Sequence, residues 1–124
     1  MGIVDDQVGS PTYTKDLAKA ILRLLEAKWF VTMDDGRWTM DEEMSGIYHV
    51  SNKGTVSWFD YAKEIFKTAG IDDVRLAGIK SNELARPAAR PAFSALDNAK
   101  FEKVTDFAMR PWQAALREYV NTRD

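Results

Sequence analysis

The chain contains 124 residues, of which 45% are hydrophobic and 29% charged, with a net charge of −2 and no cysteine. This size and balance predict one globular domain, residues 1–124, with a core of its own. The missing cysteines exclude disulfides and thiolate zinc sites, and no apolar run reaches the 18 residues of a membrane span.

The charges are dispersed, whereas binding a nucleic acid backbone requires clustered Lys and Arg. The only local basic cluster that the sequence predicts is Arg86, Arg90 and Lys100. Three cations suit one small phosphorylated ligand better than a duplex. No basic segment followed by an apolar one adjoins Met1, so we expect no signal peptide and a cytoplasmic protein, with neither nucleic acid nor membrane as partner.

The first predicted elements are a strand ending at Val4, a turn at residues 9–11 and a helix that Thr12 or Thr14 caps. One face of this helix is expected to be buried, and it consists of Leu17, Ala20, Ile21, Leu24 and Leu25. Residues 30–45 fit either a hairpin or an insertion, with a turn signal at residues 34–36. The acidic residues 41–43 lack EF-hand spacing, which favours a solvated loop and no metal site.

Residues 46–51 predict a short strand that contains His49, which we interpret as a strand residue held by its neighbours rather than as an acid or base. Ser57 and Asp60 form the ends of a capping box that starts a helix, and Gly70 stops it. The expected buried stripe of this helix is Phe59, Ala62, Ile65, Phe66 and Ala69.

A third strand is expected within residues 74–80, and the prolines make residues 81–94 irregular. A short helix follows within residues 96–104, and Pro111 is placed at the first position of the last helix. The apolar face of that helix is Trp112, Ala115, Leu116, Tyr119 and Val120. The sum is an α/β chain with more helix than strand.

Several catalytic patterns are absent from the 124 residues. There is neither a G-x-G-x-x-G loop nor a P-loop, and no Tyr is followed four residues later by Lys, a spacing that would place a phenol and an ammonium one helical turn apart. Trp58, at a helix start after a polar loop, suits a stacking role and a core role equally. In "RPAARPAFSALD", the proline-stiffened backbone carries Arg86 and Arg90, whose planar forks match phosphate oxygens. A surface crossing with solvated arginines remains the simpler interpretation of this stretch alone.

Four stretches, taken together, favour the ligand-binding interpretation over a surface crossing. They are "VDDQVGSPTYTKDLAKAI", "GIYHVSNKGTVSWFDYAKEIFKTAG", "RPAARPAFSALDNAKFE" and "RPWQAALREYV". In this order they closely resemble the C-terminal part of the dTDP-4-dehydrorhamnose reductases, a family of extended short-chain dehydrogenase/reductases. The resemblance runs from Ile3 to Val120 and is weakest over residues 28–45. It implies the mostly helical substrate-binding part of such an enzyme, with few short strands.

The family reduces the 4-keto group of a dTDP-4-keto-6-deoxyhexose with NADPH, or sometimes NADH, on the way to dTDP-L-rhamnose. Its Rossmann domain holds the cofactor and the Tyr/Lys pair, and that domain would precede Ile3. The resemblance therefore implies a fragment without catalytic or cofactor-binding residues, which binds a dTDP-sugar but reduces nothing alone.

The resemblance also implies substrate-binding residues. The amide of Gln7 would face the ligand, Gly9 and Pro11 would shape the turn, and Thr12 would cap the helix. Arg90 would face the diphosphate or stabilise the loop that does. Trp58 adds a stacking surface, and Ser94 and Asp97 match the family pattern and would cap the short helix. Many relatives carry Asn where this chain has Phe93, which removes an amide contact there.

Two alternatives remain open. Some relatives, such as the regulatory subunit of methionine adenosyltransferase, use this fold to bind a partner protein without catalysis. Loss of a Rossmann domain would also uncover apolar surface, which predicts a homo-oligomer or pairing with a separate Rossmann domain.

Overall fold

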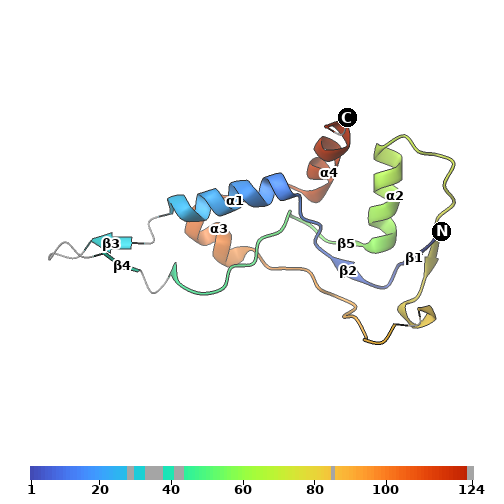
Figure 1. Cartoon of the computed structure of the whole chain (residues 1–124), viewed down its shortest axis with the longest axis horizontal. Coiled ribbons are helices and arrows are strands. Elements are labelled where there is room, and N and C mark those ends of the chain that lie inside the picture. The colour runs from blue at the N-terminus through green and yellow to red at the C-terminus, as the bar shows by residue number, and fades with distance from the viewer. Residues whose placement is uncertain (28–29, 33–37, 41–43, 85, 123–124) are drawn as a thin grey trace.

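The computed structural model describes residues 1–27, 30–32, 38–40, 44–84 and 86–122. The ribbon is elongated, with the β3–β4 pair at one end and the β1–β6 pair at the other (Figure 1). The elements in chain order are β1 (Gly2–Val4), β2 (Val8–Gly9), α1 (Thr14–Glu26), β3 (Phe30–Thr32), β4 (Trp38–Met40), β5 (Val56–Ser57), α2 (Trp58–Thr68), β6 (Ala77–Ile79), the 3-10 turn η2 (Ser81–Glu83), α3 (Ala99–Thr105) and α4 (Trp112–Asn121). The predicted α/β class with few short strands is confirmed.

The described strands form three separate pairs. β1 and β6 are parallel, with Ile3 opposite Gly78, and the pair is extended by a hydrogen bond from Asp5 N to Ile79 O at 3.1 Å. β2 and β5 are antiparallel, and so are β3 and β4, which confirms the hairpin predicted as one alternative for this region. The predicted turn at 34–36 and the acidic residues 41–43 lie outside the described residues.

The start of α1 differs from the prediction. Tyr13 occupies the N-cap position and Thr14 is the first helical residue, and no side chain within this segment caps the helix. The hydroxyl of Thr12 reaches only Ser10 O, at 3.5 Å. Instead, Asn52 Oδ1 accepts a hydrogen bond from Tyr13 N at 2.7 Å. The capping role assigned to Thr12 is therefore wrong, because a residue 39 positions away provides the acceptor.

The buried face of α1 is also rotated from the predicted one. Ala20 is fully buried and packs with Phe101 and Met109 in the main apolar core. Ile21 and Leu25, which were expected on the same face, are 49% and 74% exposed. The rotation has a polar cause, because the charged side chain of Asp16 is buried on this helix and is held there by hydrogen bonds described below.

The α2 helix begins as predicted. Ser57 Oγ accepts a hydrogen bond from Asp60 N at 3.0 Å and donates one to Asp60 Oδ2 at 2.8 Å, and Gly70 adopts a φ of +65° just past the helix. The predicted stripe, however, is at most half-buried and Ala69 is exposed. Phe59 and Phe66 of this stripe instead line an open cavity of about 890 Å³, together with residues of the following loop.

The strand predicted over residues 46–51 is not formed in the described part of the chain. The described residues there form no strand pairing. At the end of the segment a side chain holds the backbone instead: Asn98 Oδ1 accepts from Ser51 N at 3.1 Å, and Asn98 Nδ2 donates to Ser51 O at 2.7 Å. An amide side chain thus replaces a strand partner, which a β-rich local sequence cannot reveal. His49 is exposed in this segment.

α3 and α4 confirm the two predicted C-terminal helices, although Pro111 lies one residue before α4 rather than within it. Trp112, Ala115 and Leu116 are buried, as the spacing predicted, whereas Tyr119 is 45% exposed and Val120 is half-buried. Trp112 joins α4 to α2 through an edge-to-face contact with Tyr61, with ring centroids 5.4 Å apart.

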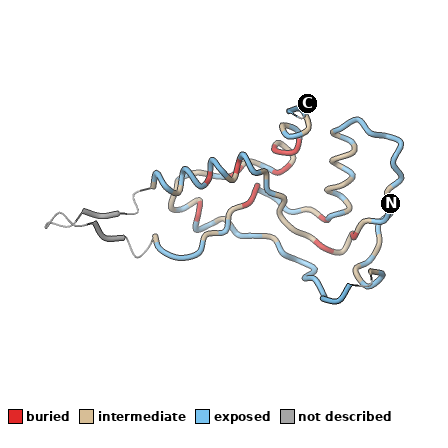
Figure 2. Tube along the Cα trace, viewed as in Figure 1, coloured by how far each residue is buried: buried red, intermediate tan, exposed pale blue. Residues whose placement is uncertain are grey.

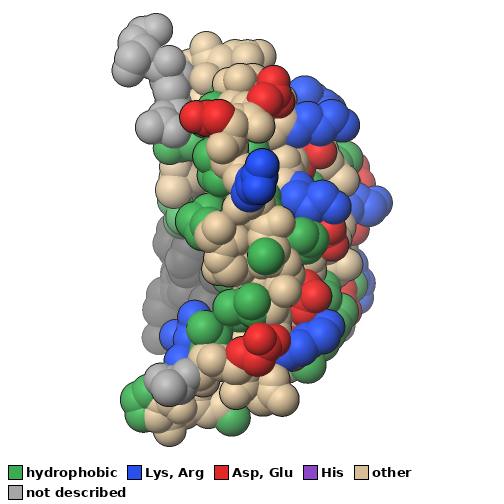
Figure 3. Space-filling model, turned by 90° about the vertical axis from the view of Figure 1, so that its right-hand side faces the viewer, with side chains coloured by type: hydrophobic (Ala, Val, Ile, Leu, Met, Phe, Trp, Pro, Cys, Tyr) green, Lys and Arg blue, Asp and Glu red, His purple; other side chains and the backbone are tan. Residues whose placement is uncertain are grey.

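Few residues are fully buried (Figure 2), and hydrophobic side chains reach the surface between charged ones at the end that carries α2, β1 and β6 (Figure 3). The accessible surface is 9026 Å², whereas a compact monomer of 14.1 kDa would expose about 6,700 Å². No helix in the described ranges is long and apolar enough to cross a membrane.

Candidate functional site

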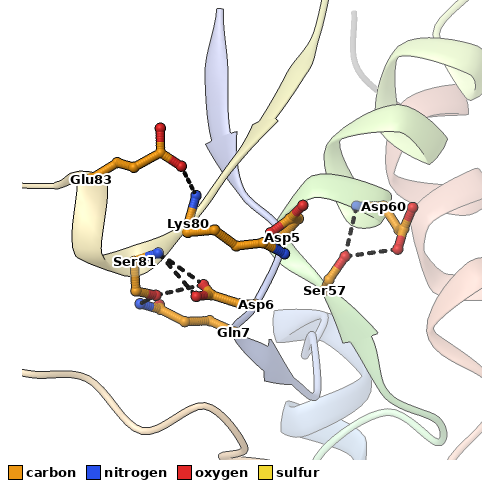
Figure 4. A network of polar contacts seen from close by, with 8 residues as sticks. All are labelled: Asp5, Asp6, Gln7, Ser57, Asp60, Lys80, Ser81 and Glu83. Carbon is orange, nitrogen blue, oxygen red and sulfur yellow. Dashed lines mark hydrogen bonds and ion pairs between the residues drawn. The ribbon is translucent and has the colours of Figure 1, made fainter.

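A polar turn, residues 5–7, follows β1, and its side chains form hydrogen bonds with Lys80 and with Ser81 of η2 (Figure 4). Lys80 Nζ bonds Asp5 Oδ1 at 2.8 Å. Ser81 donates from its backbone N to both carboxylate oxygens of Asp6, at 3.1 and 3.0 Å, and from its Oγ to Asp6 Oδ1 at 2.5 Å. Gln7 Nε2 then donates to Ser81 Oγ at 2.8 Å. Three consecutive side chains of one segment therefore hold a turn 75 residues away.

The charge states of this turn follow from its hydrogen bonds. Donation by the hydroxyl and the backbone of Ser81 holds the pKa of Asp6 below its usual value, so the carboxylate is ionised at neutral pH. The bond to Asp5 raises the pKa of Lys80. Gly78 makes room for Asp5, because a Cβ at this position would lie 2.8 Å from Asp5 Oδ2.

A second contact fastens the proline-rich segment to β2. Val8 N donates to Ala92 O at 2.8 Å, and Ser94 N donates to Val8 O at 2.9 Å. Ser94 Oγ also donates to Val8 O, at 3.3 Å, and does not cap α3. Asn98 occupies the N-cap position of α3 without a capping side-chain bond, and Asp97 Oδ1 accepts from Ala99 N, the first helical residue, at 2.9 Å. The docked segment brings Arg86 and Arg90 to the side of β1.

The two contacts together form a cavity of about 440 Å³. Its walls include Gln7, Trp58, Arg86 and Arg90, which come from three separate parts of the chain. Gln7 is 6% exposed, whereas Trp58 is 57% exposed and both arginines are exposed. The cavity thus has a fixed amide on one wall, an indole surface, and two cations.

The other predicted site residues divide between two further cavities. Gly9 and Ser94 line a neighbouring cavity of about 210 Å³ that shares Trp58 with the first, and a Cβ on Gly9 would lie 3.3 Å from Ser94 Oγ. Thr12 lines a different cavity, beside Asn52 and Trp112, and the structure does not bring it to the other predicted site residues.

The predicted basic cluster is wrong in one member. Lys100 Nζ donates to Ser45 O and lies 4.6 Å from the ring centroid of Tyr48, in a different part of the molecule from Arg86 and Arg90. Phe93 is 66% exposed beside β2. Within the described ranges, no group of three His, Cys, Asp or Glu side chains has the arrangement of a metal site.

Sequence reasoning missed a buried polar network at the start of α1, whose residues do not line the cavity of about 440 Å³. Asn52, which is 1% exposed, donates from Nδ2 to Asp16 Oδ2 at 2.8 Å and to Arg110 O at 3.2 Å. Arg110 donates from Nε to Asp16 Oδ2 and from Nη1 to Glu118 Oε2, both at 2.7 Å. The one signal in the sequence was the position of Asp16, four residues before Ala20 of the predicted apolar face. A carboxylate that is buried on such a face is rarely unpaired, so a partner could have been expected.

In this network, burial and hydrogen bonding shift the pKa of Asp16 in opposite directions, and the hydrogen bonds and nearby charges together have the larger effect. Burial alone would raise the pKa of Asp16, but hydrogen bonds from Arg110 and Asn52 lower it below its usual value. The same bond to Asp16, with a second to Glu118, raises the pKa of Arg110. Both groups are therefore charged at neutral pH, and the network joins α1, the 50–53 segment and α4.

Comparison with known proteins gives a consistent result. A family model described as the RmlD substrate binding domain matches residues 1–124. A dTDP-4-dehydrorhamnose reductase of Streptomyces griseus is 38% identical over 116 residues, which cover 94% of this chain and 35% of that protein. The spore coat polysaccharide biosynthesis protein SpsK of Bacillus subtilis is 36% identical over 121 residues, which cover 98% of this chain and 36% of that protein.

Solved structures agree with these matches. A dTDP-4-dehydrorhamnose reductase of Clostridium acetobutylicum superposes with a TM-score of 0.78 at 36% identity, and one of Bacillus anthracis in complex with NADP superposes with a TM-score of 0.78 at 31% identity. Each comparison covers 98% of this chain and 38% of the solved chain. The chain thus spans little more than a third of the length of these relatives.

Proposed function

Because the chain belongs to the RmlD substrate binding domain family, we propose that it forms the substrate-binding wall of a dTDP-4-dehydrorhamnose reductase. In this proposal it binds a dTDP-4-keto-6-deoxyhexose, and the whole enzyme reduces the 4-keto group. The observation that carries the proposal is the cavity in which Gln7, Trp58, Arg86 and Arg90 meet.

The chemistry of this cavity suits a nucleotide sugar. A guanidinium offers a planar pair of N–H donors to phosphate oxygens, and two of them lie on one wall. The half-exposed indole of Trp58 provides a flat surface on which a base or a sugar ring can stack. No described residue of the cavity is placed to act as an acid or base on a substrate, so in this proposal these residues bind and orient.

The residues present do not fit a nicotinamide cofactor. A dinucleotide pyrophosphate lies against a glycine-rich turn after a parallel strand. After β1, this chain places the carboxylates of Asp5 and Asp6 instead, and they would repel a pyrophosphate. In our proposal the site for NADPH therefore comes from residues outside these 124, and we derive no reaction step through it.

Titration with dTDP tests the proposal. Binding energy in such a site comes from both of its walls, so we expect a Kd of roughly 1 mM for this chain, or −4 kcal/mol. Replacing Arg90 with Ala should weaken binding about tenfold, as expected for loss of one charge-assisted hydrogen bond. Ligand-observed NMR is suited to this affinity range.

Arg117→Ala is the matched control, because Arg117 is an exposed arginine on α4 and does not line the cavity. Its affinity for dTDP should stay within twofold of the wild type. Equal weakening in both variants would show only a loss of overall positive charge and would contradict the assignment of Arg90.

We also propose that the β1–β6 end joins a partner, either a separate Rossmann domain or a second copy of this chain in a non-catalytic assembly. Parallel strands are normally buried within larger sheets. In the described part of the chain, however, β1 and β6 pair only with each other, as a sheet of two strands. The surface excess of about a third over a compact monomer supports this. Light scattering should give a mass that rises above 14.1 kDa with concentration, and a constant monomer mass would contradict self-association.

A further inference from the structure

The contacts of Ser81 determine the direction of its hydroxyl proton. Ser81 Oγ lies 2.5 Å from Asp6 Oδ1 and 2.8 Å from Gln7 Nε2. An ionised carboxylate can only accept hydrogen bonds, so the single hydroxyl proton of Ser81 must point at Asp6. The distance of 2.5 Å is typical of an O–H bond to a carboxylate. Ser81 Oγ is then available to Gln7 only as an acceptor.

This arrangement fixes which end of the Gln7 amide faces Ser81. Only the Nε2 end can donate to an acceptor, so the two otherwise similar ends of the amide are distinguished. In the described part of the chain, Gln7 Oε1 accepts no hydrogen bond, and the only fully buried side-chain polar atom without a partner is Arg110 Nη2. Gln7 Oε1 is therefore not completely buried, although the residue as a whole is only 6% exposed, and Gln7 lines the cavity of Trp58 and Arg90.

We infer that Asp6 and Ser81 are positioning residues that orient the Gln7 amide, so that Oε1 accepts a hydrogen bond from a hydroxyl or N–H group of the bound ligand. The identity of the ligand as a nucleotide sugar rests on the proposed function, whereas the orientation of the amide does not. The cavity then has an acceptor on one wall and cationic donors, Arg86 and Arg90, on another.

This polarity decides how a nucleotide sugar lies in the cavity. Its phosphate oxygens are acceptors, so they pair with the arginines and are repelled by Gln7 Oε1. In a dTDP-sugar the donors that remain are the hexose hydroxyls, the deoxyribose hydroxyl and the N–H of the base. We assign the contact with Gln7 to a hexose hydroxyl, and ligands that lack the hexose separate this source from the other two.

The first test needs no ligand. NMR measurement of water exchange at the side-chain amide should show one Gln7 Nε2 proton exchanging at least fivefold more slowly than those of Asn121, an exposed residue at the end of α4. Ser81→Ala should remove this difference, and Ser81→Thr, which keeps the hydroxyl, should preserve it. Equal exchange in the wild type and in Ser81→Ala would overturn the inference.

The second test compares dTDP-glucose, dTDP and pyrophosphate as ligands of the same variants. Ser81→Ala should raise the Kd of dTDP-glucose about tenfold and leave the Kd of dTDP and of pyrophosphate within twofold of the wild-type values. Ser81→Thr should restore the wild-type Kd of dTDP-glucose. Weakening of dTDP as well would support the acceptor role of Gln7 but move its contact to the nucleoside. Equal weakening of all three ligands would overturn the inference. If the wild type binds none of them, the proposed function fails, while the amide exchange still decides the orientation of Gln7.

Discussion

Replacing Arg110 with Met is expected to lower the free energy of unfolding by about 3 kcal/mol. The side chain of Asp16 is 7% exposed, and its carboxylate would lose the charge that faces it at 2.7 Å. Removing one partner of a buried pair is costly because the other charge stays buried and uncompensated. We place the effect at the low end of the usual range because Arg110 itself is 32% exposed. Urea unfolding at neutral pH measures it.

The pH dependence gives this prediction a second signature. In the wild type the folded-state pKa of Asp16 lies below its ordinary value of 3.8, so its stabilising contribution is present above pH 3.8 and is lost as the pH falls through the lowered pKa. Without Arg110, burial becomes the dominant influence and raises the pKa of Asp16. The deficit of the Met variant should therefore be largest at neutral pH. It should begin to shrink as the pH falls through the raised pKa of Asp16 in the variant, and shrink further as the pH falls through the lowered pKa of the wild type.

Arg23→Met is the control for Arg110→Met. Arg23 forms an ion pair with Glu26 on the same helix as Asp16, but the two side chains are 55% and 66% exposed. Such pairs contribute about 0.5 kcal/mol or less. Similar losses in the two variants, or a deficit for Arg110→Met that does not change with pH, would show that the buried pair does not carry the effect.

Phe101→Ala is expected to cost about 4 kcal/mol of unfolding free energy. Phe101 is fully buried and contacts Phe107 edge to face, with ring centroids 6.3 Å apart. It packs with Ala20 of α1 and with Met109, so its removal leaves a void where α1 meets α3. Domains of this size are stable by only roughly 5–15 kcal/mol, so the variant should unfold at much lower urea concentration.

Phe93→Ala provides the matched control for Phe101→Ala, because this second phenylalanine is 66% exposed and its removal should change stability by no more than about 0.5 kcal/mol. The same urea curves, followed by tryptophan fluorescence, report on both variants. A loss of less than about 1 kcal/mol for Phe101→Ala would mean that Phe101 is not central to the core.

The helices were predicted well where their signals are local. The Ser57 cap, the Gly70 stop and the buried face of α4 each depend on residues within a few positions of one another. The first helix shows the opposite case, since its cap comes from Asn52 and its buried face is set by Asp16 and Arg110. Residues 46–51 have the composition of a strand, but Asn98 instead of a strand partner holds the backbone at the end of this segment.

For the candidate site, sequence reasoning selected residues that the fold divides. Gln7, Trp58 and Arg90 line one cavity, Gly9 and Ser94 line its neighbour, and Thr12 lies elsewhere. The positioning role of Ser81 was invisible in the sequence, because a serine in an irregular segment has no distinctive pattern. Its partners, Asp6 and Gln7, precede it by more than 70 residues.

The sequence by itself determined the class of the fold, most of its helices and the family, because periodicity, caps and short motifs depend on neighbouring residues. Only the tertiary structure decided which polar side chains meet. The pairs of Asp6 with Ser81 and of Asp16 with Arg110 join positions 75 and 94 residues apart. Hydrogen bonds act over about 3 Å, so their partners are chosen by how the backbone packs and not by their order along the chain.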